Sequence, residues 1–366
     1  MYKKELELLK KRGRYRSLKS YPPSFIDLAS NDYLGLGESV QIAEEAFSLL
    51  RFFKKKGAGA SLLVNGYHPA HQLLEKKLLE LNRFERGVVV GSGFLGNMAL
   101  FQLGRRGDLF LVDRDYHASG IVGSRLTQAE VRFFNHNDPA DLERQGKDYN
   151  RFNRVFIVVE GVYSMGGDLV SPEVVELAYR LGWLIIDEAH SVGVVGNRLM
   201  GVTDLYELDP SRTIKLGTLG KSLGSYGGYI LGPAEVIEYL INRAPSIIYT
   251  TALSPFDTLY AYCSLNWIEG NLGRLVREIK KRKGLFQTES LIKPIPVPDN
   301  FLLIKLKEEL EERGIVVGAI RPPTVPQPIL RLNLRLPVPL SKIWQVVEIV
   351  SHLLGKEIIP RKPEGE

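Results

Sequence analysis

Two short apolar runs, each followed directly by polar residues, lie close together in the middle of the chain. The first reads WLIIDEAHSVGVVG over residues 183–196, and the second reads TIKLGTLGKSLGSYGGYI over residues 213–230. The first run ends at Asp187, with His190 three residues later, and the second leads into a glycine-rich turn that contains Lys221. A strand-end acid, a nearby histidine and a lysine in a turn suit a cofactor that needs a cation partner and a covalent amine.

Apolar runs and helical stretches alternate on both sides of this region. We expect strands at residues 88–90, 109–112, 131–134, 155–159, 184–186 and 213–216, with helices at 96–103, 118–126, 139–143 and 172–181. This alternation predicts an α/β fold with a mostly parallel central sheet that helices cover on both faces. Ligands bind at the carboxyl ends of such strands, and the residues that directly follow them are Gly91–Gly93, Asp113, Glu160, Asp187 and Thr218.

The flanking parts of the chain indicate smaller elements. Before residue 88 the pattern predicts a basic amphipathic helix over 2–19, a short strand from Phe25, and helices at 40–53 and 71–82. After Pro255 it predicts helices at 256–271 and on to about 286, strands at 301–305 and 316–317, a strand with Arg331, a helix ending at Leu354 and a frayed tail over 358–366. We therefore expect an N-terminal segment (1–45), a large α/β domain (46–255) and a small α+β domain (256–366).

Composition narrows the class of protein. The 366 residues are 44% hydrophobic and 25% charged, enough for one large core and a smaller second domain. The single cysteine, Cys263, excludes a disulfide framework and a cysteine-based zinc cluster, and we expect it to be buried. No run approaches the roughly 18 apolar residues of a membrane span, and residues 1–19 lack an apolar signal core. We expect no membrane segment, no bound metal and a cytoplasmic location.

Net charge leaves one alternative class to weigh. A net charge of +6 fits a nucleic-acid-binding protein. The 48 basic and 42 acidic residues are mostly interspersed, however, and dense basic patches occur only at residues 3–19, 54–56 and 280–283. We interpret these patches as solvated faces and expect no nucleic-acid partner.

A second alternative rests on glycine spacing. Gly91–Gly96 matches G-x-G-x-x-G after an expected strand, and Asp113 ends the next strand 17 residues later, as in a nicotinamide dehydrogenase. A glycine turn at a helix N-terminus binds any phosphate, so the pattern is less specific than its form. Residues 219–222 resemble part of a P-loop, but its first glycine is replaced by Lys215. The DEAH sequence at 187–190 matches a helicase motif, but that motif acts on a nucleotide that a P-loop binds. Because the P-loop pattern fails, we exclude a helicase.

Pyridoxal phosphate gives each of these residues a task. Lys221 would hold the cofactor covalently, and the glycines around it would let the backbone approach a ligand. Asp187 would pair with the pyridinium nitrogen, which keeps the ring able to accept electrons. His190 would reach the ring hydroxyl, His117 would stack on the ring face, and Thr218 would donate its hydroxyl to the phosphate. The alternatives are a surface lysine, a helix-capping aspartate and capping or surface histidines.

The chain resembles the α-oxoamine synthase family of fold-type I pyridoxal-phosphate enzymes, which share the aminotransferase class I/II fold, from about residue 12 to residue 355. The motifs that carry the resemblance are NDYLGL (31–36), SGF (92–94), HAS (117–119), EGVYSMGGD (160–168), DEAHSVG (187–193) and TLGK (218–221). The resemblance implies an acyltransferase that condenses an amino acid with an acyl thioester and releases CO₂ and the thiol. It also implies a homodimer with the active site at the interface, where residues 57–66 or 250–251 would come from the other subunit.

One stretch indicates the substrates within that family. AIRPPTVP, at residues 319–326, is most similar to the members of biotin biosynthesis, which condense L-alanine with pimeloyl-CoA or pimeloyl-acyl carrier protein. The acyl carrier protein is therefore a further expected partner. Family members that use glycine and acetyl-CoA (glycine C-acetyltransferases), or that form 5-aminolevulinate, are the nearest alternatives.

The resemblance also implies residue roles. Lys221 would act as acid and base on the alanine α-proton, while the backbone at Gly93 and Phe94 holds the phosphate. Ser164 and His190 would contact the ring substituents.

The expected substrate residues lie towards the two ends of the chain. Arg331 would hold the amino acid carboxylate, since guanidinium suits a bidentate contact. This match requires a gap of about two residues; without it the position becomes Asn333, which cannot pair with a carboxylate. Thr324, Asn31 and an N-terminal arginine, Arg12 or Arg16, would face the substrates.

Overall fold

The structure is a computed structural model that describes residues 1–358, so the expected frayed tail lies almost wholly outside the described residues. The chain divides into a large unit, Leu34–Ser164 with Asp168–Val276, and a small unit, Met1–Tyr33 with Met165–Gly167 and Arg277–Glu366. This division differs from the expected 1–45, 46–255 and 256–366. The first 33 residues group with the C-terminal part because β1 (Ile26–Asp27) pairs with β10 (Ile315–Val316).

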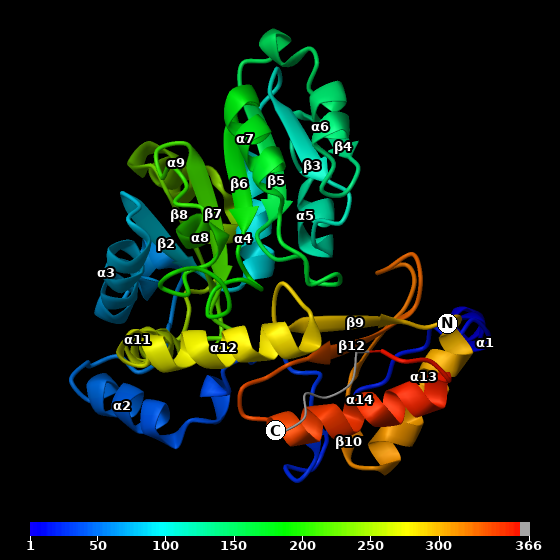
Figure 1. The fold of residues 1–366 in the computed structure, drawn as a ribbon. Helices are drawn as coiled ribbons and strands as arrows, with labels where there is room; N and C mark the ends of the chain where they lie inside the picture. The colour runs from blue at the N-terminus through cyan, green and yellow to red at the C-terminus, as the bar shows by residue number, and fades with distance from the viewer. Residues whose placement is uncertain (359–366) are drawn as a thin grey trace. The chain divides into compact units, whose positions relative to one another are not determined.

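A seven-stranded sheet forms the centre of the large unit (Figure 1). Its strands, in spatial order, are β2 (Arg86–Val90), β8 (Gly228–Gly232), β7 (Thr213–Thr218), β6 (Trp183–Asp187), β5 (Val155–Glu160), β3 (Leu109–Asp113) and β4 (Glu130–Phe134). Only β8 runs antiparallel to its neighbours; the β7-β6-β5-β3-β4 pairs are all parallel. The predicted α/β class with a mostly parallel sheet is confirmed.

Helices cover this sheet because most of its strands are mainly apolar and buried. Every residue of β3, β5 and β8 is buried, as a strand covered on both faces requires. The helices of the large unit are α2 (Val40–Leu50), α3 (Pro69–Asn82), α4 (Gly93–Leu100), α5 (Ala118–Gly123), α6 (Pro139–Gln145), α7 (Pro172–Leu181), α8 (Val202–Leu205), α9 (Ala234–Arg243), α10 (Pro245–Ile248) and α11 (Pro255–Gly270). Helix α11 packs on α2 and α3 and buries Cys263, as expected.

The strand order places the polar residues at the strand ends together. It also separates the two parts of the dinucleotide-binding pattern, the glycine turn and Asp113. Asp113, Glu160, Asp187 and Thr218 end the neighbouring strands β3, β5, β6 and β7, so they meet at one edge of the sheet. The glycine turn follows β2, and β8, β7, β6 and β5 lie between β2 and β3. Asp113 is therefore not on the strand beside the glycine turn, and the dinucleotide arrangement is absent.

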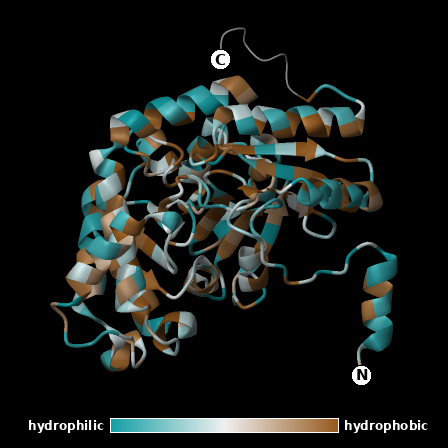
Figure 2. Cartoon of the chain, turned by 90° about the horizontal axis from the view of Figure 1, so that it is seen from below, coloured by the Kyte–Doolittle hydropathy of each residue, from teal (hydrophilic) through white to brown (hydrophobic). Residues whose placement is uncertain are grey.

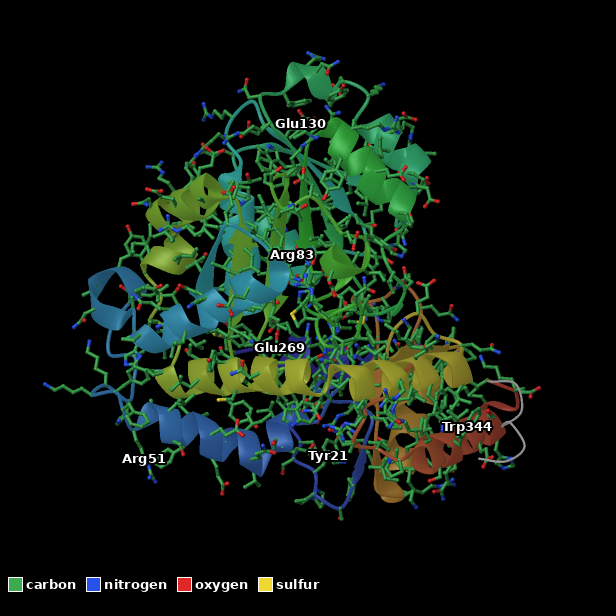
Figure 3. The ribbon with its side chains drawn as sticks, turned by 60° about the vertical axis from the view of Figure 1, so that its left-hand side comes forward. Tyr21, Arg51, Arg83, Glu130, Glu269 and Trp344 are labelled. Atoms are coloured by element: carbon green, nitrogen blue, oxygen red, sulfur yellow. The ribbon has the colours of Figure 1, made fainter. Side chains whose placement is uncertain are left out.

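Over the residues that the structure describes, the small unit contains two small sheets and three complete helices. Strands β9 (Ile292–Pro296), β12 (Ile329–Asn333) and β11 (Gly318–Ile320) form an antiparallel sheet. The helices are α1 (Lys3–Lys11), α13 (Asn300–Glu312) and α14 (Leu340–Leu354), and α12 (Leu272–Phe286) crosses the division between the units. On α14, Trp344 (labelled in Figure 3) stacks on Phe286 at 4.8 Å between ring centroids, which joins these helices by an apolar contact.

Two predicted elements are wrong. The helix expected over 2–19 ends at Lys11, because Gly13 takes a left-handed conformation (φ 60°) that ends a helix. Helix α1 buries no residue and carries mainly hydrophilic colours in Figure 2. The strand expected at 301–305 is part of α13, since Asp299 caps that helix by accepting hydrogen bonds from the N–H groups of Phe301 and Leu302.

Within residues 1–358, no helix combines the length and the apolar character that a membrane crossing needs.

Candidate active site

Asp187 ends β6 with a buried, hydrogen-bonded carboxylate. Its side chain is 5% exposed. Oδ1 accepts a hydrogen bond from the backbone N–H of Ala189 at 2.9 Å, and Oδ2 accepts one from Nδ2 of Asn97, on α4, at 3.0 Å. Each carboxylate oxygen can accept two hydrogen bonds, so Asp187 retains capacity for a further, cationic partner.

A polar chain links Asp187 to His117. Asn97 also donates to Oγ of Ser119 at 2.9 Å and accepts from the hydroxyl of Tyr116 at 2.6 Å. Oγ of Ser119 lies 2.7 Å from Nδ1 of His117, and the Ser119 N–H donates to the same nitrogen. Since Nδ1 accepts both bonds, a neutral His117 ring carries its proton on Nε2.

His117 caps α5 and is kept neutral by its surroundings. Loss of water around the ring lowers the pKa of His117, although Asp187 acts in the opposite direction. Lys221 lowers the pKa further. A neutral imidazole with an exposed face suits stacking on another ring.

Lys221 and His190 form a close pair. Nζ of Lys221 lies 2.8 Å from Nε2 of His190, whose side chain is buried. One of these two nitrogens donates to the other, so a single hydrogen bond joins two basic groups. The turn that carries Lys221 depends on Gly224 (φ 62°), because a Cβ there would lie 2.1 Å from the backbone nitrogen of Gly37.

Glu160 ends β5 beside Asp187, its register partner on β6. Its Oε2 accepts a hydrogen bond from the backbone N–H of Ser164 at 2.9 Å, and Oε1 has no hydrogen-bond partner. Burial raises the pKa of Glu160 well above its ordinary value, and the charge of Asp187 raises it further. The Ser164 side chain is itself buried at this turn.

The start of α4 offers backbone N–H groups to an anion. Ser92 caps the helix by accepting from the N–H of Leu95, and the first N–H groups of a helix, those of Gly93 and Phe94, have no partner within it. Thr218 is adjacent, since a Cβ on Gly93 would lie 3.8 Å from its Cβ. A Cβ on Gly228 would lie 2.8 Å from the Gly93 nitrogen, so glycine there lets β8 pass beside the helix start.

The Thr218 hydroxyl is already engaged in this structure. It donates to the carbonyl oxygen of Gly227 at 3.1 Å and accepts the N–H of Gly220 at 3.2 Å. Donation to a phosphate, as expected from the sequence, therefore competes with the bond to Gly227.

Arg331 and Asn333 have different surroundings in the small unit. Arg331 is 5% exposed and donates only to neutral acceptors, Oδ1 of Asn31 at 2.9 Å and the hydroxyl of Tyr33 at 3.2 Å, while its Nε is unpartnered. Nδ2 of Asn333 donates hydrogen bonds to the carbonyl oxygens of Ala29 and Ser30. In residues 1–358 no carboxylate pairs with Arg331, so its charge is available to an anion.

The remaining expected substrate residues also lie in the small unit. Arg12, Arg16 and Thr324 are exposed. Arg321 donates to the carbonyl oxygen of Gly13 at 2.7 Å, and burial together with the charge of Arg16 lowers the pKa of Arg321. The segment after α1 therefore lies beside the 319–326 stretch.

The expected site residues thus fall into two groups. The large unit brings together eight of them: Gly93, Phe94, His117, Ser164, Asp187, His190, Thr218 and Lys221. The small unit holds Arg12, Arg16, Asn31, Thr324 and Arg331. Sequence reasoning gave no role to Asn97, Ser119, Glu160 or Arg321. Ser119 and Glu160 lie in motifs that carry the resemblance, and Glu160 also ends a predicted strand. Arg321 lies in the 319–326 stretch, whereas Asn97 had no such signal.

The large-unit geometry is that of an amine, an imidazole, a buried acid and an anion-binding helix start at one sheet edge. Residues 23–342 match the aminotransferase class I and II family, so the chain belongs to that family. A curated 8-amino-7-oxononanoate synthase from Helicobacter pylori (strain J99 / ATCC 700824) is 40% identical over 346 residues, with 92% of this chain and 93% of the relative covered.

Solved structures agree with this assignment. The 8-amino-7-oxononanoate synthase of Francisella tularensis is 29% identical with a TM-score of 0.73, covering 90% of this chain and 98% of its own. A serine palmitoyltransferase from S. paucimobilis, solved with bound PLP (pyridoxal phosphate), has a TM-score of 0.85 at 22% identity, covering 96% and 97%. The second likeness shows the shared fold.

Proposed function

We propose that this chain is an 8-amino-7-oxononanoate synthase that uses pyridoxal phosphate. The reaction condenses L-alanine with a pimeloyl thioester and releases CO₂ and the free thiol, a step of biotin biosynthesis. The observation that carries the proposal is the 2.8 Å pair of Lys221 and His190, which lies in the same unit as the buried, hydrogen-bonded Asp187. The choice of substrates is supported by the Helicobacter pylori relative and the Francisella tularensis structure.

The residues present fit pyridoxal phosphate. The start of α4 can bind the phosphate through the N–H groups of Gly93 and Phe94, and Gly228 leaves the room that this approach requires. Asp187 is buried, each of its oxygens accepts one hydrogen bond from a neutral donor, and the carboxylate can pair with a protonated ring nitrogen. Lys221 supplies the amine that holds the cofactor.

The other large-unit residues orient the cofactor ring. The neutral His117 ring, which Ser119 holds in place, would stack on the cofactor ring. Ser164 and His190 contact the ring substituents, and Thr218 lies beside the phosphate-binding turn. When bound, the cofactor supplies an electron sink for the electron pair that deprotonation and decarboxylation leave on the amino acid.

Proton movement in this mechanism centres on Nζ of Lys221. In its neutral form the amine removes the alanine α-proton, and the resulting ammonium returns a proton after decarboxylation. His190 shares the proton at Nε2, since only 2.8 Å separates the two nitrogens. Asp187 would accept the hydrogen bond of the protonated ring nitrogen.

The small-unit residues bind the substrates. Arg331 holds the amino acid carboxylate, because its buried guanidinium has no carboxylate partner in residues 1–358 and keeps a free Nε. Asn31 positions Arg331 through the 2.9 Å hydrogen bond to Nη1. Arg12 or Arg16 binds the acyl carboxylate together with Thr324, and the contact between Arg321 and Gly13 supports a common site for these segments.

The proposal extends to assembly and carrier. A homodimer is supported by exposed apolar side chains on the large unit, Leu63, Val64 and Tyr249, near the bridge between Ser61 and Thr251. Either CoA or an acyl carrier protein delivers the pimeloyl group, and the enzyme acts in the cytoplasm.

A substrate matrix tests the function. Purified protein loaded with pyridoxal phosphate is given L-alanine or glycine, each with pimeloyl-CoA and acetyl-CoA, and CO₂ and free thiol are measured. The proposal expects turnover with L-alanine and pimeloyl-CoA to exceed the other three pairs. Preference for glycine and acetyl-CoA would instead assign a glycine C-acetyltransferase.

A further inference from the structure

A buried acid, Glu160, lies beside the proposed site without a role in the mechanism above. It ends β5 with 2% of its side chain exposed, in register with Asp187 at the end of β6. Neighbouring strands lie about 4.8 Å apart, so two carboxyl groups leave the sheet edge side by side. Two adjacent buried anions repel each other, which makes the charge state of Glu160 a question for the whole site.

The hydrogen bonds of Glu160 are too few for a buried anion. Its Oε2 accepts one bond, from the Ser164 N–H at 2.9 Å, and Oε1 accepts none. In residues 1–358 no cation lies within ion-pair distance of Glu160. A buried carboxylate normally needs pairing or several donors, and without them it takes up a proton instead.

Burial and the neighbouring charges together favour the protonated form of Glu160. The charge of Asp187, and more weakly that of Asp113, favours the protonated form of Glu160, whereas the charge of Lys221 opposes it. Burial is the largest influence and raises the pKa of Glu160 well above its ordinary value. Two buried phenols, Tyr116 and Tyr163, also face this group and are uncharged because burial raises their pKa.

We propose that Glu160 serves the site as a neutral carboxylic acid, a positioning residue that fixes the Ser164 turn and leaves Asp187 the only anion of the pair. The proton sits on Oε1, since Oε2 accepts from Ser164. A charged Glu160 would compete with Asp187 for the ring-nitrogen cation. This inference rests on the proposed function for its purpose, but the charge state of Glu160 is a property of the chain itself.

The first test is an infrared spectrum of the cofactor-free protein at neutral pH. Subtracting the spectrum of Glu160→Gln from that of the unchanged protein isolates this one group, and other buried acids, such as Glu188, cancel. The expected difference is the carbonyl stretch of a protonated carboxylic acid that shifts in D₂O. A carboxylate signal in its place overturns the proposal, whatever the protein catalyses. Glu130→Gln, an exposed acid on β4 (labelled in Figure 3), serves as a control that loses only a carboxylate signal.

The second test measures cofactor affinity and separates charge from position. Glu160→Gln keeps a neutral group of the same shape and an acceptor for Ser164, so its affinity for pyridoxal phosphate stays within about twofold. Glu160→Ala leaves the Ser164 N–H unpaired, and we expect roughly 5- to 100-fold weaker binding. If Gln weakens binding as much as Ala, the charge is used and the proposal is wrong. A protein that binds no cofactor but shows the protonated signal contradicts the proposed function and leaves the neutral state of Glu160 standing.

The dependence of the melting temperature on pH gives a third test, which does not need the cofactor. The folded pKa of Glu160 lies above its unfolded value, so ionisation costs stability as pH rises above about 4.5. Glu160→Gln removes this cost: its melting temperature should match the unchanged protein near pH 4 and exceed it increasingly at higher pH. Equal pH dependence in both proteins would contradict a protonated Glu160.

Discussion

Asn97 holds Asp187: its Nδ2 donates to Oδ2 of the carboxylate at 3.0 Å, across 90 residues of sequence. The same amide is fixed by Tyr116 and Ser119, so Asn97 is itself rigidly held. The acid that pairs with the cofactor is therefore oriented by α4, the helix whose first residues bind the phosphate in our proposal. In that proposal, one helix would align both ends of the cofactor.

Replacing Asn97 tests this alignment. Asn97→Ala leaves Oδ2 of Asp187 and the Tyr116 hydroxyl without a buried partner, which costs about 1–3 kcal/mol. We expect cofactor affinity and turnover to fall by roughly 10- to 100-fold. Cofactor fluorescence and steady-state kinetics measure the two effects. Ser119→Ala, which keeps the bond from Asn97 to Asp187, should affect cofactor affinity less; an equal loss would contradict a special role for Asn97.

A pair of glycine substitutions in β8 tests the phosphate-binding turn. Gly228→Ala places a Cβ 2.8 Å from the Gly93 nitrogen, so the start of α4 must shift and we expect at least about tenfold weaker cofactor binding. Gly232→Ala, in the same strand, meets no atom closer than 3.7 Å and serves as the matched control. Equal affinities of the two variants would argue against phosphate binding at α4.

Substitution of two arginines in the small unit should have different effects, one on substrate binding and the other on stability. Arg331→Lys loses a bidentate guanidinium, and we expect KM for L-alanine to rise about tenfold or more with little change in melting temperature. Arg335, 3% exposed, instead donates to the Asp27 carboxylate at 2.9 Å. Arg335→Lys should mainly lower the free energy of unfolding. We expect a loss of only about 1–3 kcal/mol, because Asp27 is partly exposed and water weakens its ion pair. An unchanged KM in Arg331→Lys would remove Arg331 from the carboxylate site.

His136 predicts how stability depends on pH. Burial lowers the pKa of His136, but hydrogen bonds to Asp113 at 3.1 Å and Asp168 at 2.9 Å outweigh it and raise the pKa to about 10. Its stabilising contribution is complete below the unfolded value of about 6.5 and is lost as pH rises towards 10. His136→Gln should therefore melt lower than the unchanged protein at pH 6, with the gap closing near pH 10. A gap that stays constant across this range would show that the imidazolium charge does not matter.

Sequence reasoning located the strand-end residues because their signals are local. Apolar runs of three to five residues define the expected strands, and parallel order then carries Asp187 and Thr218 to one edge. Lys221 followed from its glycine-rich turn. These positions need only the strand pattern and the rule that parallel strands end together.

What sequence reasoning missed depends on packing across the fold. Asn97 reads as one more residue of a helix, and only the packing of α4 brings it to Asp187. Strand β8 reads as part of the glycine-rich loop before it, and Asp299 overrides the strand-like run that follows it by capping α13. The choice between Arg331 and Asn333 rested on an alignment gap, whereas the structure separates them by their hydrogen-bond partners.

The identity of the cofactor-binding lysine tests the account most directly. Lys215, on the strand β7 that precedes the turn of Lys221, is the rival: burial lowers its pKa to about 8, but it is fully buried and bonded to Asn82, Thr203 and the Met200 carbonyl. Borohydride reduction of the protein loaded with pyridoxal phosphate, followed by proteolysis and mass spectrometry, locates the amine that carries the cofactor. We predict the label on the peptide of Lys221 and none in Lys221→Ala. A label on Lys215, or no label on the unchanged protein, would contradict the account.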